Sequence, residues 1–271
     1  QRARPALFGV GQNPARVSAS AIHTAPATGL SLQSRQRLWA WGFVAVLTLA
    51  WWASQGRVPV YILPPPAEVA RAMASFATNP QRLGHLAVTL MHIGSAIAIS
   101  FVLGAAMAFT AHAWGWSAAL IHRRLSPFLS AFSGIGWTLL AVIWFGVSST
   151  TVVFTIVAVL LPFALVNLRE GLLALDKELL EMGRSFGRAP LRHWRLLTLP
   201  ALVPFAAVTL RIMFGVAWKV TLTAELFGGG QGLGYLINVA RQDYDTAILF
   251  AVILLIIGFV SLADRWVFLP L

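Results

Sequence analysis

Long apolar runs, separated by short polar segments, fill most of this 271-residue chain. A helix needs about 20 mostly apolar residues to cross the hydrocarbon layer of a bilayer. The runs predict six transmembrane helices, at about residues 38–54, 85–111, 125–145, 152–168, 200–227 and 246–263. The predicted fold class is therefore an all-α membrane protein, with a transmembrane domain over 38–271 and a polar tail over 1–37.

The third and fourth predicted helices lie within one uncharged run, 125–168, which is too long for a single span. The polar residues 146–151 (GVSSTT) divide this run into two. Pro162 predicts a kink in the second of the two helices. Between the first and second spans, the prolines at 64–66 interrupt any helix, and an amphipathic helix is expected at about 68–77.

Arginine and lysine residues are unevenly distributed about the predicted spans. The tail, the second-to-third loop, the fourth-to-fifth loop and the C-terminus carry 5, 2, 6 and 1 of them, a total of 14, whereas the outer loops carry 4. Cytoplasmic loops are enriched in these residues. Both termini and the loop between spans four and five are therefore expected in the cytoplasm.

The composition agrees with a membrane-embedded chain. Hydrophobic residues make up 58% of it and charged residues 11%, with a mean hydropathy of +0.76, whereas a soluble domain carries roughly 25% charged residues. The net charge of +11 does not indicate nucleic-acid binding, because the sequence lacks basic patches interleaved with aromatic residues on a soluble face. The chain contains no cysteine, which excludes disulfides, thiolate metal sites and cysteine nucleophiles.

The most informative polar segment is 178–200, ELLEMGRSFGRAPLRHWRLLTLP. It begins with good helix formers, and acidic residues precede the arginines, an order that suits the helix dipole. Gly187 tolerates a positive φ and can end this helix, and Pro190 can begin a second short one. The segment therefore predicts two short helices joined by a sharp bend, which form an elbow over 176–199 outside the lipid.

The spacing within this elbow resembles that of permease subunits of bacterial ATP-binding-cassette (ABC) importers. Their pattern is Glu-Ala-Ala, three residues, Gly, nine residues, Ile-x-Leu-Pro. Here Met182 and Gly183 replace the two alanines and Leu197 replaces the isoleucine, while the remaining positions are in register. Without this spacing, an ordinary basic cytoplasmic loop would be the better interpretation. The resemblance implies that the elbow contacts an ATPase subunit through Glu181, Met182, Gly183, Arg184, Gly187, Leu197, Leu199 and Pro200.

The resemblance extends over most of the chain and is closest to the branch of importers for nitrate, sulfonate, taurine and bicarbonate. It implies a permease subunit of the bacterial inner membrane that is not itself an enzyme. Its implied partners are two ATPase subunits, a second permease copy in a homodimer, a periplasmic binding protein and the lipid bilayer. ATP and Mg²⁺ would bind to the ATPase subunits, with no cofactor or metal in this chain. The implied substrate is a small anion, such as nitrate, a sulfonate, bicarbonate or a small carboxylate.

Two cations and one acid in the fifth predicted span are candidates for the translocation pathway. A cation in hydrocarbon costs roughly 2.5–3.5 kcal/mol on insertion scales, so Arg211 and Lys219 should face protein or water. Their spacing puts them about 80° apart around the helix, and Gly215 between them leaves room. Alternatively, Arg211 bonds to carbonyl groups, and Lys219 reaches the interface or pairs with Glu225. Glu225 itself either gates or braces the outer mouth.

Other polar features give no indication of catalysis. His92 lies within the second span, where an interior histidine bonded to a neighbouring helix is a simpler interpretation than a metal ligand or proton relay. The glycine-rich segment 227–235 does not match a phosphate-binding loop and predicts a tight outer turn. No set of nucleophile, base and acid is present, so we expect no catalytic residues.

Two questions remain open on the sequence. In the third span, 144–146 (WFG) matches the importer family, but 133–137 (SGIGW) replaces its Pro-x-Pro-Pro, and the two glycines offer an alternative source of irregular backbone. The function also has an alternative, a stand-alone channel or secondary transporter. That alternative predicts acidic residues within the spans, and the sequence has none away from their ends.

Overall fold

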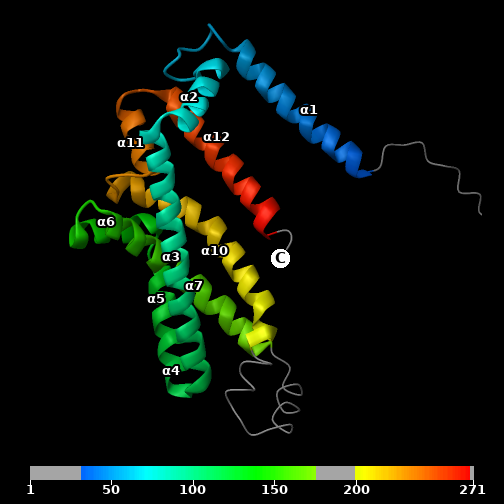
Figure 1. The fold of residues 1–271 in the computed structure, drawn as a ribbon. Coiled ribbons are helices and arrows are strands. Elements are labelled where there is room, and N and C mark those ends of the chain that lie inside the picture. The colour runs from blue at the N-terminus through cyan, green and yellow to red at the C-terminus, as the bar shows by residue number, and fades with distance from the viewer. Residues whose placement is uncertain (1–31, 175–198, 269–271) are drawn as a thin grey trace, which may run out of the picture. The chain divides into compact units, whose positions relative to one another are not determined.

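The computed structural model describes residues 32–174 and 199–268, and these residues are almost entirely helical (Figure 1). The chain divides into two units, 1–50 and 51–271. The described part of the first unit belongs to helix α1 (Leu32–Ala53), of which Trp39–Ala53 is apolar. All the other described helices belong to the second unit.

Three long helices form the centre of the second unit: α3 (Pro80–Ala113), α7 (Ser149–Leu173) and α10 (Leu199–Gly228). Helix α7 packs against both α3 and α10 (Figure 1). A fourth long helix, α12 (Thr246–Ala263), continues into the π-helical turn η3 (Asp264–Phe268). Among the described residues, these four helices are the ones long and apolar enough to cross a membrane singly.

The third predicted span is broken in the structure. Helix α5 (Ser126–Ala131) stops before Ser133, and α6 (Gly134–Phe145) follows at 87° to the preceding helical segment. The Ser133 side chain accepts a hydrogen bond from the Gly136 N–H and so caps α6. An irregular backbone is therefore present beside the two glycines. If this bent pair is one span, the described residues contain five candidate spans. The six transmembrane helices and the cytoplasmic termini expected from the sequence stay predictions.

The shorter helices only partly match the sequence-based expectations. The amphipathic helix expected at 68–77 is confirmed as α2 (Pro66–Thr78). Two segments expected to be loops are partly helical. The first contains α4 (Gly115–Leu120) and the π-helical turn η1 (Ile121–Leu125), which follow α3. The second is the glycine-rich segment, within which α11 (Leu233–Gln242) begins. The sequence does not indicate where α11 starts, because its N-cap is Gly232 (φ 108°), which has no side chain to cap the helix.

The predicted division between the third and fourth spans is confirmed. Helix α6 ends before Gly146, which has a φ of 67°, a conformation that favours glycine. Helix α7 then begins at Ser149, and the side chain of Ser148 accepts a hydrogen bond from the Thr151 N–H at 3.3 Å. A glycine stop and a serine cap therefore separate the two apolar helices.

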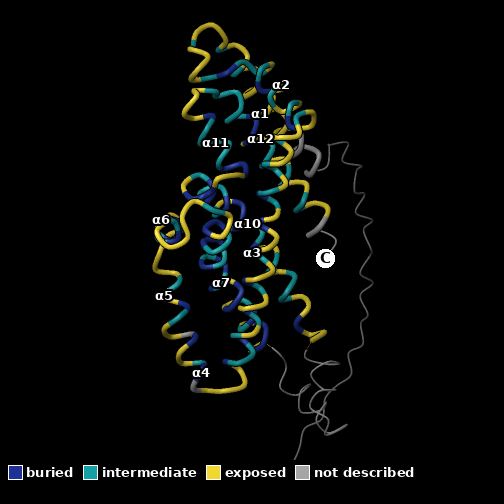
Figure 2. Tube along the Cα trace, turned by 60° about the vertical axis from the view of Figure 1, so that its left-hand side comes forward, coloured by how far each residue is buried: buried dark blue, intermediate teal, exposed yellow. Residues whose placement is uncertain are grey.

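Small residues allow the central helices to approach closely. A Cβ atom on Gly104 of α3 would lie 2.6 Å from the Cβ of Ala164 on α7, and one on Gly171 of α7 would lie 2.9 Å from the Cβ of Phe205 on α10. Buried positions gather where α3, α7 and α10 face one another (Figure 2). Because lipid is as apolar as a protein core, close packing rather than hydrophobic burial holds such helices together.

Replacing Gly104 by alanine is expected to destabilise the packing of α3 on α7, because the added methyl group would overlap Ala164. Overpacking of this kind costs about 1–3 kcal/mol. Gly94→Ala is the matched control, since a Cβ at Gly94 meets no atom within 4 Å and alanine is the better helix former. Thermal unfolding in detergent, followed by tryptophan fluorescence, should show a lower midpoint for Gly104→Ala only. Equal midpoints would contradict this packing.

Candidate functional site on helix α10

Helix α10 carries a fully buried carboxyl group near its C-terminal end. Glu225 is 0% exposed, in a helix that is otherwise mostly apolar. An unpaired carboxylate in a protein interior costs several kcal/mol, because it loses its hydration. Glu225 therefore requires hydrogen-bond donors from the elements around it.

Helix α3 and the start of α11 supply these donors. Thr89 Oγ1 donates to Glu225 Oε2 at 2.9 Å, and the Gly234 N–H donates to the same oxygen at 2.8 Å. Glu225 Oε1 lies 2.8 Å from His92 Nδ1, so a proton bridges these two atoms. The Leu233 N–H donates to Thr89 Oγ1 at 2.7 Å. We call Thr89, His92, Glu225 and the N–H groups of Leu233 and Gly234 the carboxylate cluster.

Three glycines allow the chain after α10 to approach the carboxylate. A Cβ atom on Gly229 would lie 2.9 Å from the Cα of Glu225, and one on Gly234 would lie 2.6 Å from its Cβ. At Gly232, where φ is 108°, a Cβ would overlap the carboxyl group itself. The glycine-rich turn therefore brings the N-terminal end of α11, with its free N–H groups and positive dipole, to a negative charge.

The sequence contains a signal for this cluster that hydropathy does not reveal. His85, Thr89 and His92 occupy positions i, i+4 and i+7 of an apolar helix and so share one face. In the structure this face meets α11 as well as Glu225, because the Gly232 N–H donates to His85 Nδ1 at 3.1 Å. The interpretation of His92 as an interior histidine bonded to a neighbouring helix is confirmed.

Arg211 forms an ion pair nearer the other end of α10. Its Nε and Nη2 atoms donate to the two carboxylate oxygens of Asp264, at 2.9 and 3.1 Å. The side chains are 52% and 46% exposed, so that this pair contributes only about 0–1 kcal/mol where water screens it. The partner of Arg211 is thus a carboxylate at the end of α12 rather than the carbonyl groups considered above.

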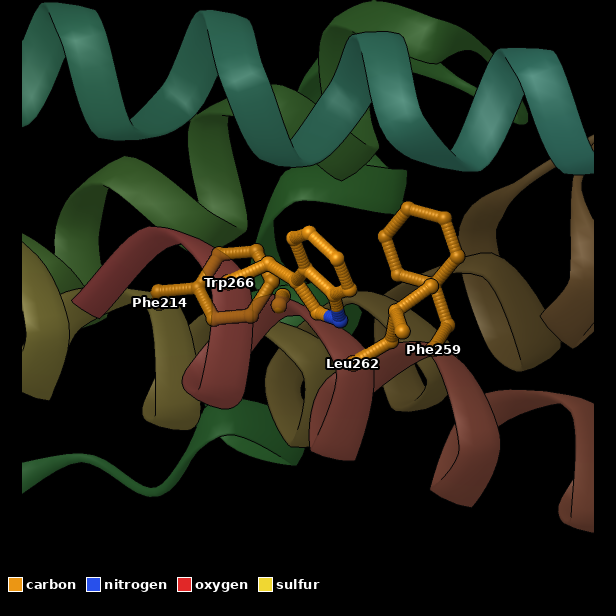
Figure 3. Close-up of a pocket in the computed structure, with 5 residues that line it drawn as sticks. Phe214, Phe259, Leu262 and Trp266 are labelled. Atoms are coloured by element: carbon orange, nitrogen blue, oxygen red, sulfur yellow. The ribbon is translucent and has the colours of Figure 1, made fainter. Parts of the chain in front are cut away.

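An apolar pocket of about 550 Å³ lies between α10, α12 and η3. Its walls are the side chains of Phe214, Phe259, Leu262, Ala263 and Trp266 (Figure 3). None of these side chains carries a charge, and the indole of Trp266 is the only one with a polar atom. The pocket therefore offers little to hold an anion in a defined position.

Lys219 lies on the exposed face of α10, between Arg211 and Glu225 along the helix. Within the described residues its ammonium group has no hydrogen bond and no ion pair. It does not pair with Glu225, whose carboxylate is bonded to α3 and α11. One turn away, Gly215 is also exposed, and a Cβ there would meet no atom within 4 Å. The surface beside Lys219 is therefore open.

Most of the elbow lies outside the described residues, including Glu181, Met182, Gly183, Arg184, Gly187 and Leu197. Leu199 and Pro200 are described, as the first two residues of α10. The role of the elbow in contacting an ATPase stays a prediction, as does the place of Arg211, Lys219 and Glu225 in a pathway. In the described part of the chain, no group of three or more His, Cys, Asp or Glu residues could hold a metal ion.

Comparison with known proteins identifies the family. The sequence profile of the binding-protein-dependent transport system inner membrane component matches residues 100–269, more than half of the chain. A probable ABC transporter permease protein of Brucella melitensis is 28% identical over 205 residues, which cover 74% of this chain and 81% of the relative. The taurine transport system permease protein of Escherichia coli is 27% identical over 242 residues, covering 81% and 86%.

A further relative, a putative aliphatic sulfonates transport permease protein of Escherichia coli, is 27% identical over 228 residues, which cover 82% of this chain and 84% of the relative. The matches agree with the helical, membrane-compatible architecture of the described residues. The resemblance inferred from the sequence is thus confirmed at the level of the family. This chain belongs to the family of binding-protein-dependent transport system inner membrane components, and it is a transport component rather than an enzyme.

Proposed function

We propose that this chain is the permease subunit of an ATP-driven importer and forms the pathway for a small anion. Membership of the family supports the class of transporter. Two relatives are named for the transport of taurine and of aliphatic sulfonates, which supports a substrate with an anionic acid group. The structural observation that carries this proposal is Lys219, a cation on the exposed face of α10 with no partner among the described residues.

The surroundings of Lys219 favour an anion. The charge of Arg211 is compensated by Asp264. The carboxylate of Glu225 is surrounded by hydrogen-bond donors. Among the described charged residues of α10, this leaves Lys219 without a compensating partner. The start of α6 lies close by, since a Cβ on Gly134 would be 3.7 Å from a methyl group of Val220. In several transporters the N-terminal ends of broken helices point at anionic substrate groups. A sulfonate, nitrate, bicarbonate or small carboxylate fits this environment better than a cation.

The proposed assembly contains two copies of this chain, two ATPase subunits and a periplasmic binding protein in the bacterial inner membrane. Both termini and the elbow at 176–199 face the cytoplasm. ATP and Mg²⁺ bind to the ATPases, whose closure moves the elbow and opens the pathway outward, and hydrolysis resets it. The support for this arrangement is the family, together with the Glu-x₅-Gly-x₉-Leu-x-Leu-Pro spacing over 181–200.

A secondary transporter is the second candidate, and the buried pair of His92 and Glu225 is the observation that favours it. Histidine and carboxylate groups inside membranes can relay protons. However, Glu225 Oε2 is already bonded to the Thr89 hydroxyl and to a backbone N–H, and Oε1 to His92. A carboxylate enclosed in this way suits a structural role better than a relay.

Lys219→Met should weaken anion transport, because it removes the positive charge while keeping an unbranched side chain of similar length. Loss of one charge-assisted contact corresponds to a rise in the substrate KM of about tenfold. Lys219→Arg should retain most of the activity. Ile212→Met is the control, since Ile212 is also exposed on α10. The measurement is the initial rate of ATP-dependent uptake into vesicles that contain the whole complex. Unchanged uptake with Lys219→Met would remove this residue from the pathway.

Gly187→Val should uncouple the permease from its ATPases, because the bend predicted from the sequence at this position requires a residue that tolerates a positive φ. We expect the ATPase activity that substrate-loaded binding protein stimulates to fall about fivefold or more, the lower end of typical coupling between sites. Ser185→Ala, in the three-residue spacer of the same elbow, is the control. A stand-alone transporter would tolerate the change at Gly187, so normal transport by this variant would contradict the proposed partnership.

A further inference from the structure

Helix α10 is apolar on both its buried and its exposed faces. Its buried residues include Leu202, Met213, Ala217 and Ala224, and its exposed residues include Val203, Val208, Ile212 and Phe227. In a membrane, burial of apolar side chains does not distinguish these faces, because lipid hydrocarbon is as apolar as the protein interior. Hydrophobicity alone therefore does not determine how α10 is rotated about its own axis.

Glu225 does distinguish the two faces. Its carboxylate is satisfied only where Thr89, His92 and the Gly234 N–H converge. If α10 rotated, the carboxylate and its donors would be left without partners in a site that excludes water, which is the costliest arrangement for polar groups. The carboxylate cluster therefore favours one rotational setting of the helix.

The other polar side chains buried on α10 do not provide such a restraint within the described structure. The Thr209 hydroxyl donates to the Phe205 carbonyl of its own helix at 2.6 Å. The Thr221 hydroxyl and the Trp218 indole N–H have no hydrogen-bond partner there. Among the described residues, Glu225 is thus the one buried side chain of α10 whose hydrogen bonds reach another helix.

We propose that Glu225 is a positioning residue for transport: through the carboxylate cluster it sets the rotation of α10 and so directs Lys219 toward the pathway. The two residues are six positions apart, or about 120° around the helix. Holding Glu225 in the interior therefore turns Lys219 and Gly215 to the exposed side. This inference rests on the proposed function, in which Lys219 contacts the anion.

Two substitutions at position 225 test the hydrogen bonds of the carboxylate cluster. The carbonyl oxygen of glutamine can accept from Thr89 and Gly234, so Glu225→Gln keeps bonds of the same reach without the carboxylate. Alanine removes every one of these bonds. The rotational setting of α10 should therefore be lost in Glu225→Ala and largely kept in Glu225→Gln.

The absence of cysteine from the chain allows thiol labelling to report the rotation of α10. Gly215→Cys places a thiol in open space on the exposed face. Thr221→Cys places one on the buried face, where the native side chain is 0% exposed. Each is introduced into the full chain, in membrane vesicles, with Glu225 retained or replaced by Ala or Gln. Rates of reaction with a small maleimide are measured at one pH for all variants and compared with those in the Glu225 background.

With Glu225 retained, the thiol of Gly215→Cys should react at least about tenfold faster than that of Thr221→Cys, since burial of the second thiol opposes its reaction. Glu225→Ala should abolish most of this ratio. Glu225→Gln should keep most of the ratio, because its carbonyl oxygen still accepts from Thr89 and Gly234. If Glu225→Ala does not accumulate in the membrane, Thr89→Val decides by itself, since it removes one donor to Glu225 and should lower the ratio.

The possible failures are distinguishable. A ratio that is the same in all backgrounds would overturn the positioning role and leave the proposed function intact. If Gly215→Cys does not react even with Glu225 retained, the exposed face of α10 does not meet water. That result would overturn the anion pathway itself, and the positioning role with it.

Discussion

The carboxylate of Glu225 can be buried only because separate elements bring donors to it, and several features of the fold meet that requirement. Helix α3 presents Thr89 and His92 on one face. Helix α11 begins where its first N–H groups point at the cluster. The turn between α10 and α11 is rich in glycine because side chains there would collide with Glu225. One buried charge thus joins α10 and α11 to α3, whose two side-chain partners lie more than 130 residues before Glu225 in the chain.

The charged groups of α10 divide between structural and exposed roles. In the first half of the helix, Arg211 pairs with Asp264 of η3. Near the C-terminal end, Glu225 is enclosed by neutral donors and a histidine. Between them Lys219 is exposed, beside a glycine that leaves open space. A helix held by its buried carboxylate, with an exposed cation on another face, suits a subunit that holds part of an anion pathway in place, which is the function proposed for this member of the family.

Much of the helical architecture could be predicted from the sequence, because a membrane-crossing helix produces a long apolar run that stops at polar residues. The bounds of α7, α10 and α12 follow the runs closely. The 87° break between α5 and α6 could not be predicted, since its angle depends on the packing of α6 against α7 and α10. Hydropathy also could not pair His92 with Glu225, because 133 residues separate them. The elbow was recognised by its spacing alone, and it lies largely outside the described residues.

Transport by this chain is, on our proposal, driven by ATP hydrolysis in partner subunits and selective for anions. The most direct measurement is uptake of a labelled sulfonate into proteoliposomes that contain the purified chain, with or without its ATPase and binding-protein partners. We expect saturable uptake only with the complete complex and ATP on the side of the ATPases. Comparable uptake by the chain alone, without any nucleotide-hydrolysing partner, would contradict the proposal.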